Sequence, residues 1–210
     1  MSIQFDKKHF AKSRPLPMLV VVDPCKRHLK KRGSLAHGDT AGGLARCRAA
    51  LAHARELGMV VAFVRDRRTR EAASESAWIN NFEPGRYDRL FELRAPSCYS
   101  SPYFAEAAAA SGEIVVIGYL ADGACVSTAL DAVRAGHNIV FLRDAVIAGP
   151  TERAFCRAIA DVAALSSGSP IGALDTTDWT MLPKGSQSRV PSAISVPHRA
   201  AARIPSLRLS

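Results

Sequence analysis

The chain has 210 residues, of which 48% are hydrophobic and 22% are charged. This composition is typical of one globular domain of ordinary size with short extensions. No run of about 18 apolar residues predicts a membrane-spanning helix. The N-terminus also lacks the apolar core of a signal peptide, so we expect a cytoplasmic protein with no membrane partner.

The formal net charge of +9 is concentrated in two segments. Residues 24–33 and 184–210 each contain five lysines and arginines and no acidic residue, so the rest of the chain is nearly neutral. Neither segment interleaves aromatic residues with the basic ones, and no known nucleic-acid-binding motif is present. We therefore expect solvated surface charge there, and nucleic acid is not an expected partner.

The predicted elements alternate between strands and helices after an N-terminal arm at residues 1–16. Apolar runs rich in β-branched residues predict buried strands, and apolar stripes bounded by caps and glycines predict helices. The strands are expected at 17–23, 59–64, 113–118 and 138–142, with short ones near 90–93 and 171–174. The helices are expected at 40–57, 102–111, 125–135 and 151–165, with a short one near 71–80. The basic tail, 184–210, is predicted to be disordered.

Strands that are apolar throughout, separated by helices, indicate a parallel sheet covered on both faces. The sequence thus predicts a doubly wound, Rossmann-like α/β fold in a single domain over residues 17–183. In such sheets ligands bind beyond the carboxyl ends of the strands, where the strand order reverses. The first strand is followed by DPCKRH instead of a glycine-rich turn, which argues against a dinucleotide site.

Two chemically active side chains follow strands of this sheet. Asp23 ends the first strand, and Cys125 begins the helix that follows strand 113–118. If the strand order reverses between them, the carboxylate faces the thiol, while the helix N-terminus favours a thiolate and offers N–H groups to an oxyanion. Arg94 or Arg65 would supply a cation. Spacing alone leaves open that Asp23 is a turn residue and that Cys125 is buried filler.

The stretch VVIGYLADGACVSTALDAVRAGHNIVFLRDAV resembles the isochorismatase-like cysteine hydrolase family. The matching positions are Cys125, Val126, Thr128, Ala129, Ala132, Gly136, Asp144 and Ala145, together with LVVVD ending at Asp23. The resemblance implies a six-stranded parallel sheet and an aspartate–lysine–cysteine triad that hydrolyses amides of small molecules. It implies Asp23 as the base, Cys125 as the nucleophile of an acyl-enzyme, and backbone groups at Ala121, Asp122 and Ala124 as the oxyanion site. Relatives of this kind are commonly oligomers, so a homodimer or homotetramer is expected.

The chain departs from the family pattern at the lysine. The matching stretch FELRAPSCYSSPYF has no lysine, and Arg94 is the nearest equivalent. Arginine keeps the charge but does not transfer protons, so an inactive relative that binds a small ligand is the alternative function. The family's aspartate-x-glutamine or asparagine becomes Asp23-Pro-Cys25, which adds a second thiol and leaves open redox pairing of Cys25 with Cys125.

No cofactor and no metal ion are expected. The five cysteines are scattered without a C-x-x-C pair, and the segment RDRRTREAASESAWINNFEPGRYDRL contains none of the histidines with which one branch of the family holds zinc. The histidines His28, His37, His53 and His137 have no ligand spacing and are interpreted as surface groups. The substrate pocket is predicted to use Cys25, Trp78, Phe82 and Tyr99, although these aromatic residues equally suit a plain core.

Overall fold

The structure is a computed structural model of the chain, and it describes residues 15–30, 40–67, 76–120, 124–148, 153–158 and 170–182. The predicted N-terminal arm, apart from residues 15 and 16, and the whole of the basic tail, 184–210, therefore lie outside the described residues. So do parts of the helices expected at 71–80 and 151–165. No described helix is long and apolar enough to span a membrane.

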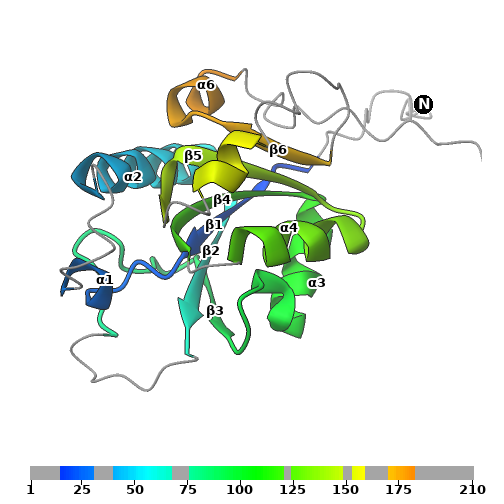
Figure 1. The fold of residues 1–210 in the computed structure, drawn as a ribbon, viewed down its shortest axis with the longest axis horizontal. Helices are drawn as coiled ribbons and strands as arrows, with labels where there is room; N and C mark the ends of the chain where they lie inside the picture. Colours follow the sequence, from blue (N-terminus) through cyan, green and yellow to red (C-terminus); the bar gives the residue numbers. More distant parts are fainter. Residues whose placement is uncertain are drawn as a thin grey trace, which may run out of the picture.

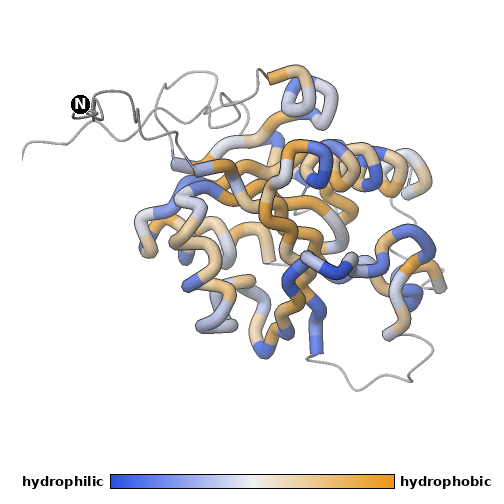
Figure 2. The backbone as a smooth tube through the Cα atoms, turned by 180° about the vertical axis from the view of Figure 1, so that it is seen from behind, coloured by the Kyte–Doolittle hydropathy of each residue, from blue (hydrophilic) through white to orange (hydrophobic). Residues whose placement is uncertain are grey.

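A six-stranded, all-parallel sheet forms the centre of the described domain, with strand order β3-β2-β1-β4-β5-β6. The strands are β1 (Met18–Val22), β2 (Val60–Asp66), β3 (Arg89–Leu93), β4 (Glu113–Leu120), β5 (Asn138–Ala148) and β6 (Ile171–Leu174). Every residue of β1 and of β4 is buried, as expected for strands covered on both faces. In Figure 2 the hydrophobic segments accordingly gather in the central sheet. The predicted fold class is confirmed.

Helices cover both faces of the sheet, α2 and α6 on one side and α3 and α4 on the other (Figure 1). Their bounds are α2 (Thr40–Glu56), α3 (Pro102–Ser111), α4 (Ala124–Arg134) and α6 (Thr176–Thr180). A short 3₁₀ helix, η2 (Cys98–Ser100), precedes α3, and residues 153–158 are helical. Each face therefore has its own hydrophobic cluster, separated from the other by the sheet.

Three local predictions differ from the structure. Residues 76–80 are not helical, because Cys25 and Trp78 form an antiparallel bridge there. The basic stretch after β1, expected to be solvated surface, contains the helix α1 (Arg27–Lys30), in which Arg27 is buried. Strand β5 continues to Ala148 instead of ending at 142, and its register with β4 shifts between Val116 and Gly118.

Candidate functional site

The strand order reverses between β1 and β4, which are direct neighbours. Their register pairs Val22 with Gly118, so Asp23 follows β1 at the level where Tyr119 stands in β4. Parallel strands with this reversal leave a crevice at their carboxyl ends, where ligands bind in open α/β sheets. The predicted adjacency of the two strand ends is therefore confirmed. Helix α1 lies beyond the carboxyl ends of β1 and β2 (Figure 1).

Gly118 permits the close approach of β1 and β4 at this point. Its φ angle is +105°, and a Cβ atom placed on it would lie 2.3 Å from the carbonyl oxygen of Val22 and 2.8 Å from its nitrogen. No side chain tolerates that contact with backbone atoms, and the φ value itself favours glycine. The glycine of the signature stretch is thus required by the backbone geometry next to Asp23.

Asp23 has the backbone conformation of a sharp turn, with φ at +50°, and is only 3% exposed. Its amide donates to the carbonyl of Val64 at 2.7 Å, and its carboxylate Oδ1 accepts a 3.2 Å hydrogen bond from the amide of Asp66. Strand β2 therefore holds both the backbone and the side chain of Asp23. An aspartate tolerates this left-handed conformation better than most residues do.

Two side chains of α1 bind the other carboxylate oxygen of Asp23. Arg27 forms a buried ion pair with Oδ2, and His28 places Nε2 at 2.5 Å from the same atom. Arg27 also donates to the carbonyl of Asp66 at 3.0 Å and is 6% exposed. Burial alone would raise the pKa of Asp23, but hydrogen bonds and charge from His28 and Arg27 outweigh it and hold that pKa below its usual value.

Cys25 and Tyr119 complete what we call the polar cluster, which consists of Asp23, Cys25, Arg27, His28 and Tyr119. The Cys25 thiol is hydrogen-bonded to the Asp23 carboxylate; burial, followed by that carboxylate, raises its pKa to about 12. Cys25 therefore stays protonated at neutral pH and is a poor nucleophile. The imidazole of His28 stacks on the ring of Tyr119, with centroids 4.4 Å apart and planes inclined by 8°.

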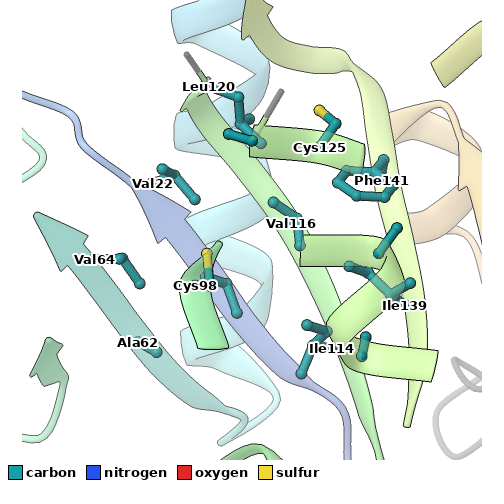
Figure 3. Close-up of a cluster of buried hydrophobic side chains, with 14 of the residues drawn as sticks. Val22, Ala62, Val64, Cys98, Ile114, Val116, Leu120, Cys125, Ile139 and Phe141 are labelled. Carbon is teal, nitrogen blue, oxygen red and sulfur yellow. The ribbon is translucent and has the colours of Figure 1, made fainter. Parts of the chain in front are cut away.

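Cys125 stands in different surroundings, in the first turn of α4. Its side chain is fully buried in the hydrophobic cluster on the α3 and α4 face, which we call the apolar cluster. Figure 3 shows the sulfur on α4 beside Leu120 and Phe141, with Val22 across β4. Ala124, a predicted oxyanion residue, precedes it and is buried, whereas Ala121 and Asp122 lie outside the described residues.

Arg94, predicted as the cation, lies at the surface. It follows β3, two strand spacings or about 10 Å from β1, and it is exposed. It borders a 470 Å³ surface pocket that also involves Glu92, Ser100 and Tyr103. Among the described residues, the cation that contacts Asp23 is Arg27. The role of Arg94 in catalysis thus stays a prediction, without a contact to Asp23 in the described part of the chain.

The predicted aromatic walls are divided between the two faces. Trp78 is partly buried and bridges to Cys25, and the guanidinium of Arg65 lies 4.0 Å from its ring centroid, so both adjoin the polar cluster. Phe82 is 1% exposed and belongs to the core on the α2 face. The hydroxyl of Tyr99 is hydrogen-bonded to Nδ1 of His137 at 2.7 Å, next to the C-terminal end of α4. The structure therefore does not bring Tyr99 to Asp23, and Phe82 is core.

Other signature residues have structural roles. Thr128 accepts a hydrogen bond from the amide of Cys98 and so connects α4 to η2. Asp144 accepts from the amide and hydroxyl of Thr176 and pairs with Arg46 at 2.8 Å, which fixes α6 and α2 against β5. These contacts give Thr128 and Asp144 structural roles that account for a threonine and an aspartate at these positions.

Arg27 and His28 are the site residues that sequence reasoning missed. The interpretation of His28 as a surface group is wrong, since its side chain is 19% exposed and binds Asp23. Their position in the sequence could have indicated this role, because both lie four to five residues after Asp23, the aspartate at the end of β1, in the short helix α1. Among the described residues, no group of three or more histidine, cysteine, aspartate or glutamate side chains is placed to hold a metal ion.

Comparisons with known proteins agree with this geometry. The chain matches the Isochorismatase domain family over residues 17–167. No curated protein shows significant similarity to it.

Solved structures with the same fold carry different activities in their names. A cysteine hydrolase from Pseudomonas syringae pv. phaseolicola is 17% identical with a TM-score of 0.63, covering 78% of this chain and 90% of the other. The N-carbamoylsarcosine amidase of Thermoplasma acidophilum is 22% identical with a TM-score of 0.60, covering 77% and 96%. The MAR1 ribonuclease of Caenorhabditis elegans is 15% identical with a TM-score of 0.62, covering 93% and 98%. The family match over most of the chain, together with Asp23 and Cys125 at the strand ends, establishes that this protein belongs to the isochorismatase family of hydrolases.

Proposed function

We propose that the protein hydrolyses an amide or related C–N bond of a small molecule through Cys125. The observation that carries this proposal is the placement of Asp23 and Cys125 after the two adjacent strands between which the strand order reverses. An acid and a thiol at this position match the arrangement that nucleophilic acyl transfer needs. The family match supports the hydrolytic class.

In the first half-reaction the sulfur of Cys125 attacks the carbonyl carbon, and the thiol proton passes to Asp23. The carbonyl oxygen becomes an oxyanion, to which the amide groups of Ala124 and Cys125, at the start of α4, would donate, with Ala121 and Asp122 as further predicted donors. When the C–N bond breaks, the proton moves from Asp23 to the departing amine. Because the pKa of Asp23 is held below its usual value, the carboxyl group gives up this proton readily.

In the second half-reaction water hydrolyses the thioester. Water adds to the thioester carbonyl while Asp23 accepts one of its protons, and the C–S bond then breaks. The products are a carboxylic acid and the restored Cys125 thiol, which recovers the proton. In these steps Cys125 supplies the nucleophile and Asp23 the proton acceptor, which are the two groups that the proposed acyl transfer uses.

We further propose that Arg27 supplies the positive charge that the family takes from lysine. Its guanidinium contacts the Asp23 carboxylate and is buried, whereas Arg94 is exposed at the end of β3. A permanently charged arginine holds Asp23 ionised before the thiol proton arrives but does not itself carry a proton. Arg94, the nearest equivalent of the family lysine in the sequence, would then contribute little to the rate.

A second candidate function is ligand binding without hydrolysis. The observation that favours it is that the Asp23 carboxylate already contacts three groups: the side chains of Arg27 and His28 and the amide of Asp66. A carboxylate with this many donors and a lowered pKa is a weaker base than an unpaired one. Under this alternative the same crevice binds a small molecule and releases it unchanged.

The decisive experiment compares two buried cysteines of the same cluster. Cys125→Ala is expected to reduce release of ammonia from a panel of small amides by about 10³-fold or more. Cys98→Ala is the matched control, because Cys98 is equally buried in the apolar cluster and has no proposed role in the reaction. A covalent acyl adduct on Cys125, seen by mass spectrometry after rapid quenching, would support the hydrolase. Ligand binding with no adduct and no turnover would favour the second candidate.

A further inference from the structure

Strand β3 lies at one edge of the sheet (Figure 1), and among the described residues it pairs with β2 alone. The amide of Arg67, just after β2, donates to the carbonyl of Leu93 at 3.2 Å, so the main-chain groups of Leu93 face β2. Because these groups point to opposite sides at successive residues of a strand, those of Leu90 and Glu92 face outward. The outer edge of β3 therefore presents the N–H and C=O groups of both residues to a further strand.

A groove runs along this edge between β3 and helix α3. It consists of two surface pockets of 650 Å³ and 470 Å³ that share Leu90, Phe91 and Tyr103. Leu90 is 50% exposed and Tyr103 is 75% exposed, although both side chains are largely apolar. Helix α3 adds the small side chains of Ala107 and Ala110 to the wall of the groove. A further strand beside β3 would therefore pair with its outward main-chain groups and cover apolar surface at the same time.

The charges along this edge fit β3 of a second copy of the chain. In a symmetric antiparallel pair the outward groups meet in three registers, with Leu90 opposite Leu90, Leu90 opposite Glu92, or Glu92 opposite Glu92. The first register puts Glu92 opposite Asp88 and the third puts Glu92 opposite itself, and like charges directly opposite each other are destabilising. The second register puts Arg94, which forms no ion pair with a described residue, opposite Asp88 of the other copy. Glu106, another acidic residue, lines the same end of the groove.

We propose that two copies of the chain associate through β3 in this second register, so that their sheets join into one continuous sheet. Leu90 of each copy exchanges main-chain hydrogen bonds with Glu92 of the other, and Phe91 faces Phe91 of the other copy at the two-fold axis. The same surface serves both copies, as a two-fold interface requires. Leu90 and Tyr103 of both copies are then removed from water together. This inference does not depend on the proposed reaction.

Sedimentation velocity of the full chain measures the association. The wild-type protein is expected to form a dimer, and Leu90→Lys should raise the Kd of that dimer by at least about 10-fold, because it places an ammonium group at the paired edge. Leu130→Lys is the matched control, because Leu130 on α4 is 49% exposed and lies away from β3. A monomer at every concentration would overturn the inference and leave this edge to another occupant, such as a terminal segment of the same chain or a different protein. Dissociation by Leu130→Lys but not by Leu90→Lys would also overturn it, since the interface would then lie on α4.

Disulfide cross-linking tests the register. Leu90→Cys and Glu92→Cys combined in one chain should give a covalent dimer on a non-reducing gel after treatment with oxidised glutathione. Residues that exchange hydrogen bonds across antiparallel strands are about 5.5 Å apart at Cα, which a disulfide spans. The natural cysteines are all buried, and a link within one chain would not double the mass. The two single variants are the matched controls, because each would cross-link only in one of the rejected registers. Equal cross-linking by a single variant, or none by the combined variant, would overturn the inference.

Discussion

The two faces of the sheet differ sharply at the carboxyl ends of β1 and β4. Beyond the end of β1 the polar cluster brings a carboxylate, a guanidinium and an imidazole into direct contact, and the ring of Tyr119, on the α2 face, stacks on that imidazole. On the α3 and α4 face, the apolar cluster surrounds Cys125 with residues such as Leu120 and Phe141 (Figure 3). The proposed reaction takes place at the boundary between these two environments.

In the proposed reaction, this difference would keep the Cys125 thiol apart from the charges that activate it. Apolar surroundings favour a neutral thiol over a thiolate and make a buried cysteine less reactive. The carboxylate proposed to accept the thiol proton lies beyond the end of β1, where Arg27 and His28 bind it. Asp23 is therefore held ionised by Arg27, while the sulfur of Cys125 is buried among apolar side chains. Variants that change only residues of the polar cluster should test whether its charges act as one buried unit.

Arg27→Met, which removes the cation of the polar cluster, is expected to cause the largest loss of stability. Removing one partner of a buried ion pair leaves Asp23 charged and uncompensated, which costs about 3–5 kcal/mol of the free energy of unfolding. Arg27→Lys, which keeps the charge, should lose less. Chemical denaturation at pH 7 measures both.

Arg143→Gln is the control, because it breaks an ion pair at the surface. The side chain of Arg143 is 41% exposed and that of its partner Asp175 is 37% exposed. A surface pair of this kind contributes about 0–1 kcal/mol. If Arg27→Met were no more destabilising than Arg143→Gln, the polar cluster would not be a buried, coupled unit. Arg94→Met offers a separate comparison of activity: it should keep most of the turnover that Arg27→Met loses.

Much of the scaffold could be predicted from the sequence, and the reasons are local. Runs such as MLVVV and EIVVIGYL are apolar along almost their whole length, so burial on both faces follows directly, and with it the parallel sheet. The positions of Asp23 and Cys125 at strand ends followed from the same runs. These features depend on pattern and chain order, which the sequence displays.

The partners of these residues could not be predicted, because they depend on how the chain turns. Arg27 and His28 stand in a basic stretch that resembles solvated surface, and only the left-handed turn at Asp23 directs α1 back over the carboxylate. Tyr99 suited a pocket wall by type, yet its hydroxyl pairs with His137, thirty-eight residues away. Contacts between residues that are distant in sequence, or that follow an unusual backbone angle, need the folded structure.

Gly118→Ala tests the boundary between the two faces, and its expected effect is the next largest. The added Cβ would meet the Val22 backbone at 2.3 Å, at a φ of +105°, so β1 and β4 would have to separate beside Asp23. We expect a loss of about 3 kcal/mol in the free energy of unfolding together with loss of turnover. Gly112→Ala is the control, since its φ is +71° but a Cβ atom added there would have no neighbour within 4 Å among the described residues. Equal losses in the two variants would show that backbone angle, not the approach of the strands, is what Gly118 provides.

The smallest expected effect is the pH dependence of the two acid–arginine pairs. The pKa of Asp23 in the folded protein lies below its usual value, despite burial, because of His28 and Arg27. The pKa of Asp175 is lowered by its hydrogen bonds to Arg143. For a lowered carboxyl pKa, the stabilisation is fully present above the unfolded value of about 3.9 and is lost as the pH falls through the folded value. The difference in unfolding free energy between the wild type and Asp23→Asn should therefore be constant from pH 7 to about pH 5 and shrink below about pH 4.

Salt distinguishes the two pairs in this titration. High salt screens exposed charges strongly and buried charges much less. Adding about 0.5 M sodium chloride should therefore remove most of the corresponding difference for Asp175→Asn and leave that for Asp23→Asn largely unchanged. Urea denaturation at a series of pH values, with and without salt, measures both differences. If the contribution of Asp23 proved as sensitive to salt as that of Asp175, water and ions would reach its carboxylate freely, and the polar cluster would not hold Asp23 ionised for the proposed transfer of the Cys125 proton.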